Sequence, residues 1–184
     1  DPYGQLRYEG EHLPPIVVLD SELHGGNGGS RPFRGDVMYL GTMSKTLAPG
    51  LRIGWVVAPE EVIFKLVQLK QGADLHTGTF NQMVAWETAR GGFLDLHVRR
   101  LRELYRARRD AMLAALERSF PPGCSWTRPK GGLFLWARLP EGMDSAKVLE
   151  RALSEEKVAF VPGNAFNSRG GGANSLRLNF SDSP

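Results

Sequence analysis

The chain has 184 residues and a formal net charge of +3, which fits one domain or one and a half. Its hydrophobic content of 41% is typical of globular proteins and excludes a largely disordered chain. The single cysteine, Cys124, excludes an internal disulfide framework and a cysteine-based zinc site. No apolar run reaches the roughly 18–20 residues of a membrane span. The small positive net charge does not by itself predict a nucleic-acid or membrane partner.

The first two thirds of the chain alternate strand and helix patterns. Residues 1–20 predict strand and turn, and residues 24–30 (HGGNGGS) predict a glycine-rich surface loop. The apolar run 37–40 predicts a strand of the kind that is buried on both faces of a parallel sheet. A second strand is expected at 53–58, and helices are expected at 60–71, 79–90 and from Gly91-Gly92 to about residue 120.

The pattern changes after Pro121-Pro122-Gly123. Strands are expected at 132–138, 158–161 and 176–180 around a helix at 144–156, with Trp126, Phe134, Leu135 and Trp136 in the core. We therefore expect two domains, at residues 1–120 and 121–184. The long helix carries six arginines, for which we favour a solvated face over a nucleic-acid stripe because acidic residues interrupt them: Arg99, Arg100, Arg102, Arg106, Arg108 and Arg109.

The strongest chemical signal is the segment GTMSKTLAPGLRIG at residues 41–54. Lys45 follows an apolar strand, and α/β proteins place ligands in the loops at the ends of such strands. A desolvated lysine has a lowered pKa and acts as a nucleophile. The hydroxyls of Thr42 and Ser44, with the guanidinium of Arg52, could bind a phosphate group. An amine beside a phosphate site is what pyridoxal phosphate requires, although a solvated lysine in a polar turn has the same local pattern.

The segment YLGTMSKTLAPGLRIGWVVAP resembles the Schiff-base lysine region of fold-type-I pyridoxal-phosphate aminotransferases. Within them it is most similar to the group of 2-aminoadipate and kynurenine aminotransferases and the aminotransferase-like half of MocR regulators. Four further blocks follow the family's order: DPYGQLRY, QGADLHTGTFNQ, TRPKGGLFLWARLP, and VPGNAF with NSLRLNFS. The resemblance implies an α/β fold of type I, with the C-terminal part of the large mixed-sheet domain followed by a truncated small α+β domain.

The resemblance also implies a reaction and the residues that serve it. The reaction is transamination between an α-amino acid and a 2-oxo acid, with pyridoxal 5'-phosphate as cofactor, no metal, a cytoplasmic location and a homodimer. Lys45 would form the Schiff base and carry the proton at the substrate Cα. Thr42, Ser44 and Arg52 would bind the phosphate, and Tyr3 the phenolic oxygen of the cofactor. Arg177 would bind the substrate α-carboxylate.

The sequence departs from the family pattern at its start. Asp1 matches the second aspartate of the family's Asp-Asp-Pro-Tyr, so the carboxylate that faces the pyridine nitrogen is expected just upstream. We therefore expect a C-terminal portion that is incomplete for catalysis by itself. Two alternatives remain open, namely an effector domain of a MocR/GntR-type regulator, with a DNA-binding domain upstream, and an inactive fragment. The substrate side chain is not readable from these residues.

Overall fold

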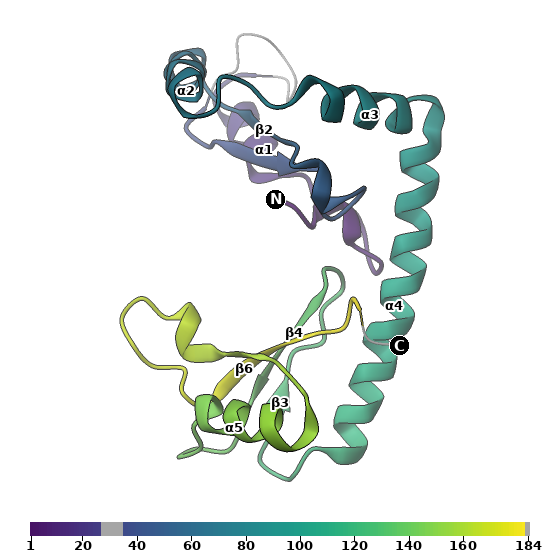
Figure 1. The fold of residues 1–184 in the computed structure, drawn as a ribbon, viewed down its shortest axis with the longest axis vertical. Coiled ribbons are helices and arrows are strands. Elements are labelled where there is room, and N and C mark those ends of the chain that lie inside the picture. Colours follow the sequence, from purple (N-terminus) through teal and green to yellow (C-terminus); the bar gives the residue numbers. More distant parts are fainter. Residues whose placement is uncertain (27–34, 183–184) are drawn as a thin grey trace. The chain divides into compact units, whose positions relative to one another are not determined.

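The computed structural model describes residues 1–26 and 35–182, so most of the predicted surface loop at 24–30 lies outside the described residues. The chain divides into two compact units, Asp1–Arg102 and Glu103–Pro184. Helix α4 (Phe93–Ser119) begins in the first unit and ends in the second (Figure 1). The domain boundary expected at residues 120 and 121 stays a prediction. Among the described residues, no helix is both long and apolar enough to cross a membrane.

Residues 16–19 begin a helix, so the prediction of strand and turn is wrong for this segment. A short 3-10 helix, η1 (Gly4–Leu6), is followed by α1 (Ile16–Leu23). Pro15 occupies the N-cap position, and its carbonyl accepts a hydrogen bond from the Val18 N–H at 2.9 Å. Proline suits the start of a helix because its ring fixes φ and it lacks an N–H that would need a partner. A short apolar run does not distinguish helix from strand by its periodicity.

Strands β1 (Tyr39–Thr42) and β2 (Gly54–Val57) form a two-stranded antiparallel sheet. The predicted environment, a parallel sheet that buries both strand faces, is therefore wrong for the described chain, where Leu40 is 63% exposed. The connection between the strands is too short for the crossover that parallel neighbours require. Gly41 lies opposite Trp55, and a Cβ on Gly41 would lie 2.2 Å from the indole Cε2. Only glycine lets the indole cross the strand there.

The predicted helices of the first unit are confirmed. They are α2 (Glu60–Ala73), α3 (Thr79–Ala89) and the long helix α4. A 3-10 turn, η3 (Arg90–Gly92), separates α3 from α4, and Gly91 there has a φ of 78°. This left-handed conformation suits glycine and breaks the helix. The Gly91-Gly92 pair thus ends one helix and lets the next begin in a new direction.

The second unit contains a four-stranded antiparallel sheet in the order β3-β4-β6-β5. The two central strands confirm the predictions at 132–138 and 176–180. The strand expected at 158–161 is shorter than expected and begins only at residue 161. The strands are β3 (Ser125–Trp126), β4 (Phe134–Arg138), β5 (Val161–Pro162) and β6 (Ser175–Asn179). Two residues are too few to show a pattern, which is why β3 was not predicted.

One face of this sheet forms the core of the second unit. Ala137, Leu139 and Leu176 are buried, and Phe120, Cys124, Trp126, Val148, Phe160 and Leu178 pack against them. Val148 lies on α5 (Ser145–Arg151), which Figure 1 shows beside the sheet. The Asp144 side chain caps α5 by accepting a hydrogen bond from the Ala146 N–H at 2.9 Å. The helix predicted over 144–156 continues after α5 as a π-helical turn, η4 (Ala152–Glu156).

The arginines of α4 do not form one solvated face. Arg99, Arg100 and Arg106 are exposed, as expected, but Arg109 is only 5% exposed. Its guanidinium donates to the Pro129 carbonyl at 2.7 Å and to Asp110 Oδ1 at 2.6 and 2.9 Å. The prediction of a solvated face is therefore wrong for Arg109. A buried guanidinium needs such partners because leaving a charge unpaired costs several kcal/mol, on the order of 3–5.

Candidate active site

The turn that contains Lys45 joins β1 to β2. The Met43 carbonyl accepts hydrogen bonds from the N–H groups of Leu47 and Ala48, at 2.9 and 3.2 Å. The Met43 N–H in turn donates to the Ile53 carbonyl at 3.2 Å, which closes the connection at its base. Lys45 is half-buried, and its side chain makes no hydrogen bond or ion pair with any residue in 1–26 or 35–182. An amine held on a closed turn without a protein partner is available to a ligand.

Two hydroxyls meet at the start of this turn. Thr42 Oγ1 lies 2.9 Å from both Ser44 Oγ and the Ile53 carbonyl oxygen, and it accepts from the Ser44 N–H at 3.1 Å. A hydroxyl has one proton, and a carbonyl oxygen can only accept. When Thr42 donates to Ser44 Oγ, the Ser44 hydroxyl keeps its own proton for another acceptor. When Thr42 donates to the Ile53 carbonyl instead, the Ser44 hydroxyl donates to Thr42. In the first arrangement the pair offers a hydroxyl donor to a ligand, one residue from Lys45 in the chain.

Arg52 ends the same connection in an unusual conformation. It follows a 3-10 helix, η2 (Pro49–Leu51), and has a φ of 54°, which costs a non-glycine residue about 1–2 kcal/mol. Its backbone N–H and its Nη1 both donate to the Pro49 carbonyl, at 3.3 and 3.2 Å. The Asn81 side chain donates to the Leu51 carbonyl at 3.2 Å and so ties η2 to α3. The exposed guanidinium keeps further N–H donors for an anion.

These groups have the chemistry that a phosphorylated aldehyde needs. Hydroxyl and guanidinium donors match the three acceptor oxygens of a phosphate, and the Lys45 amine matches an aldehyde carbon. All four residues belong to one connection, and the Thr42–Ser44 pair is in direct contact. Tyr3 lies elsewhere in the first unit, at the N-cap of η1, where its N–H donates to Asp1 Oδ1 at 2.9 Å. The residues present therefore fit pyridoxal phosphate in donor type.

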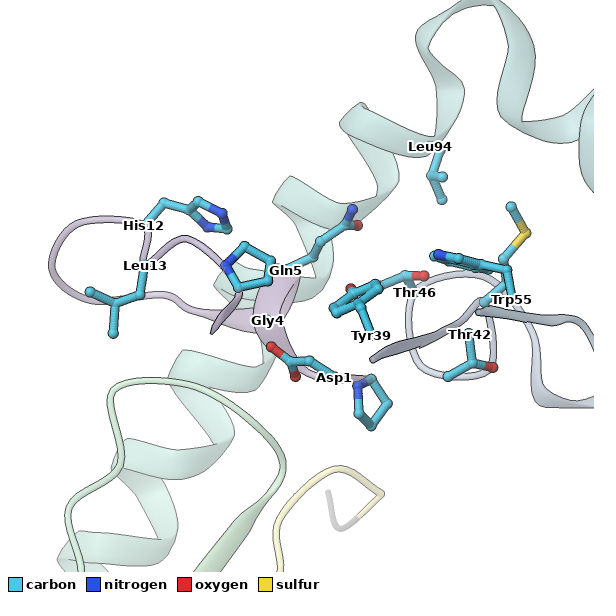
Figure 2. Close-up of a pocket in the computed structure, with 13 residues that line it drawn as sticks. Asp1, Gly4, Gln5, His12, Leu13, Tyr39, Thr42, Thr46, Trp55 and Leu94 are labelled. Carbon is cyan, nitrogen blue, oxygen red and sulfur yellow. The ribbon is translucent and has the colours of Figure 1, made fainter. Parts of the chain in front are cut away.

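A pocket of about 160 Å³ lies between the N-terminal turn and the β1–β2 sheet (Figure 2). Of the predicted site residues only Thr42 lines it; Thr46 also lines it, whereas its neighbour Lys45 does not. The remaining walls include Asp1 and residues that the sequence did not single out: Gly4, Gln5, His12, Tyr39, Trp55 and Leu94. The glycine opposite Trp55 was the available signal, since glycine inside a strand often marks a close approach.

Arg177 lies in the second unit, on β6. Its guanidinium carbon is 4.1 Å from the centroid of the Phe134 ring and 4.9 Å from that of Phe166. Within the described part of the chain, its side chain has no hydrogen bond and no carboxylate partner. Its N–H groups are therefore free to bind an anion. Phe166 ends a short 3-10 helix, η5 (Gly163–Phe166), and the sequence predicts no role for it at the site. Phe134, expected in the core, lies instead beside Arg177.

Known proteins resemble this chain over its whole length. The family model for aminotransferase class I and II matches residues 15–184. Aromatic-amino-acid aminotransferase 1 of Thermococcus litoralis is 48% identical over 184 residues, which are all of this chain and 41% of that protein. A helix-turn-helix-type transcriptional regulator of Bacillus subtilis, YisV, is 32% identical over 98% of this chain and 34% of its own length.

Solved structures of aminotransferases also resemble this chain. The multiple substrate aminotransferase of Thermococcus profundus has a TM-score of 0.88 and 46% identity, covering all of this chain and 42% of that one. LysN, the α-aminoadipate aminotransferase of Thermus thermophilus, was solved with N-(5'-phosphopyridoxyl)-L-leucine. It has a TM-score of 0.87 and 45% identity, covering 98% of this chain and 44% of its own. The chain thus spans less than half the length of these relatives, shares the α/β fold of the type I pyridoxal-phosphate aminotransferases, and belongs to the class I and II aminotransferase family.

Proposed function

We propose that this chain is the part of a pyridoxal-phosphate-dependent aminotransferase that supplies the cofactor-binding lysine and the carboxylate-binding arginine. The observation that carries the proposal is that the Lys45 amine has no partner among the described residues. It lies on the same β1–β2 connection as the Thr42–Ser44 hydroxyl pair. Family membership supports the reaction class. The reaction would transfer an amino group from an α-amino acid to a 2-oxo acid.

Each residue of the β1–β2 connection would have a distinct task. Lys45 would be the Schiff-base lysine and, when substrate replaces it, would move the proton at the substrate Cα. Ser44, Thr42 and Arg52 would hold the phosphate, and Tyr3 would donate to the phenolic oxygen. When bound, the cofactor stabilises the negative charge that develops at Cα. The protein supplies position and proton transfer.

Arg177 would bind the substrate α-carboxylate. A planar guanidinium can form two parallel hydrogen bonds to a carboxylate, which lysine cannot. Support comes from the absence of any acidic partner for Arg177 among the described residues. In the same proposal the carboxylate facing the pyridine nitrogen lies just upstream of Asp1, the complete protein is a cytoplasmic homodimer, and residues 1–120 and 121–184 correspond to its large and small domains.

Reductive trapping tests the assignment of Lys45. The full-length protein is incubated with pyridoxal phosphate, reduced with borohydride, digested and mapped by mass spectrometry. We expect one adduct, on Lys45, and none in K45R. The matched control K65R changes an exposed lysine on α2 and should keep the adduct. An adduct on another lysine only, or no adduct in the wild type, would refute the proposal.

A regulator is the second candidate, because helix-turn-helix regulators such as YisV match most of this chain. A regulator would keep the cofactor but would not need turnover. Steady-state assays with amino donors and 2-oxo acids, together with a DNA-binding assay on the full-length protein, separate the two. Turnover without DNA binding supports the enzyme. Specific DNA binding without turnover would overturn the proposal in favour of the regulator.

A further inference from the structure

The sheet of the second unit has two chemically different faces. Directly opposed residues of antiparallel strands point to the same face, and successive residues alternate. Leu176 lies opposite Ala137, and both belong to the buried core. Arg177 lies opposite Trp136 on β4 and Val161 on β5, so its side chain points away from that core. The guanidinium is thus held on the face that the core does not use.

Two aromatic rings border the guanidinium on this face. Phe134 lies opposite Asn179, one alternation along from the Trp136–Arg177 pair, which is a diagonal position within reach of a long side chain. Phe166 arrives from η5, outside the sheet. The Arg177 guanidinium carbon lies over both rings, at 4.1 and 4.9 Å from their centroids. Both distances fall inside the range of a cation–π contact.

Phe166 is itself held in place. Its ring meets Trp136 edge to face, with centroids 5.3 Å apart and an interplanar angle of 77°. The Asn167 side chain donates to the Gly163 carbonyl at 3.1 Å, which closes the η5 turn. Phe166 is 47% exposed and is not among the residues that pack against the core of this unit. Its contacts are thus directed at Trp136 and Arg177 rather than at the core.

The rings restrict a side chain that is otherwise free to rotate. An arginine has several rotatable bonds, and fixing them when a ligand binds has an entropic cost. A guanidinium that lies over a ring face offers its N–H groups at its edge, where a carboxylate can approach in the same plane. No carboxylate within the described residues fixes Arg177 instead. The aromatic contacts are what orients it before substrate arrives.

We propose that Phe134 and Phe166 are positioning residues that orient the Arg177 guanidinium for the α-carboxylate of the substrate. The inference rests on the proposed role of Arg177. The rings do not touch the reacting atoms, so their removal should weaken carboxylate binding and leave the chemical step intact.

The test compares F134L and F166L with two kinds of control variant in full-length, cofactor-loaded protein. F134Y and F166Y keep the ring. F160L removes a ring that packs against the opposite, core face of the same sheet. Each leucine variant at 134 and 166 should raise the KM for the amino acid about 10-fold, or ~1.4 kcal/mol, with kcat within about twofold. The tyrosine variants should stay close to wild type, and F160L should lower thermal stability without raising KM.

A matched amine that lacks the carboxylate supplies a second readout. Its Kd for the loaded protein should be unchanged in F134L and F166L, because no carboxylate is there to orient. In the double variants with R177A, the leucine substitutions should have no further effect on the KM for the amino acid. If R177A itself leaves this KM unchanged, the proposed role of Arg177 fails. If R177A raises it but F134L and F166L do not, the positioning inference alone is overturned.

Discussion

Gly163 is where the fold around Arg177 should tolerate change least. A Cβ at this position would lie 2.3 Å from Ser175 Oγ and 2.7 and 2.8 Å from the carbonyl oxygens of Gly172 and Ser175. Carbon needs about 3.5 Å from such neighbours, so the two carbonyl oxygens would have to move by ~0.7–0.8 Å. They are not free to do so, because the Gly172 carbonyl accepts from both the N–H and the hydroxyl of Ser175, at 3.0 and 2.8 Å.

We therefore predict that G163A is destabilised by overpacking. Forcing one extra methyl group into a tightly packed site costs about 1–3 kcal/mol. For a chain of this length, 1 kcal/mol corresponds to a fall in Tm of about 2–4 °C, so the expected loss is ~2–12 °C. Because Gly163 begins the η5 turn that ends at Phe166, the same substitution in the full-length protein should also raise the KM for the amino acid.

The matched control is G72A. Gly72 lies in α2 with no atom within 4 Å of its Cβ position, so alanine there should stabilise the helix by about 0.5–1 kcal/mol. Thermal unfolding is followed by circular dichroism at a fixed cofactor concentration, because a bound ligand shifts Tm. A Tm of G163A equal to or above that of the wild type, with G72A behaving as expected, would refute the packing argument.

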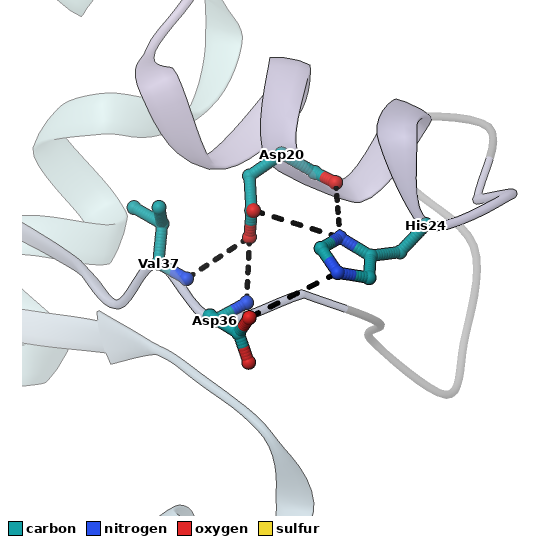
Figure 3. Close-up of polar contacts among 4 residues, drawn as sticks. All are labelled: Asp20, His24, Asp36 and Val37. Carbon is teal, nitrogen blue, oxygen red and sulfur yellow. Dashed lines mark hydrogen bonds and ion pairs between the residues drawn. The ribbon is translucent and has the colours of Figure 1, made fainter.

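Three further outcomes are expected. R109M should lower the free energy of unfolding by about 1–3 kcal/mol, because it removes a buried charged donor from the partly buried Pro129 carbonyl. R100M changes an exposed arginine of the same helix and should change this free energy little; equal effects of the two substitutions in denaturant titrations would contradict the prediction. The hydrogen bond to the Asp20 carbonyl, and then the charge of Asp20, raise the pKa of His24 above 6.5 (Figure 3). The protonated form therefore stabilises the fold, and this contribution is lost as the pH rises from 6.5 through the raised pKa. Over that range the free energy of unfolding of the wild type should fall relative to that of H24Q. A His24 pKa at or below 6.5 in an NMR titration would contradict this prediction. T42V should raise the Kd for pyridoxal phosphate about 10-fold, because the hydroxyl that orients Ser44 is lost. The same Kd for T42V and wild type in absorbance titrations would contradict this prediction.

The local elements of the chain were largely predictable because their signals are local. The apolar stripe of α4, the glycine pair before it and the proline run after it define that helix within a few residues. Lys45, Thr42, Ser44 and Arg52 were found together for the same reason, since they lie on one connection between two strands. The segment 16–19 shows the limit, because an apolar run of that length fits a helix and a strand equally well.

Contacts between distant segments were decided only by the tertiary structure. Arg177 was recognised by its place in a motif, but its two ring partners depend on the register of β4 against β6 and on the turn that returns Phe166 to that face. The sequence predicts a solvated side chain for Arg109, whereas in the fold its guanidinium donates to the Pro129 carbonyl. A sequence by itself determines which residues can be helical, apolar or charged. Which of them meet across a fold depends on pairing register and burial, and neither is encoded within a few neighbouring residues.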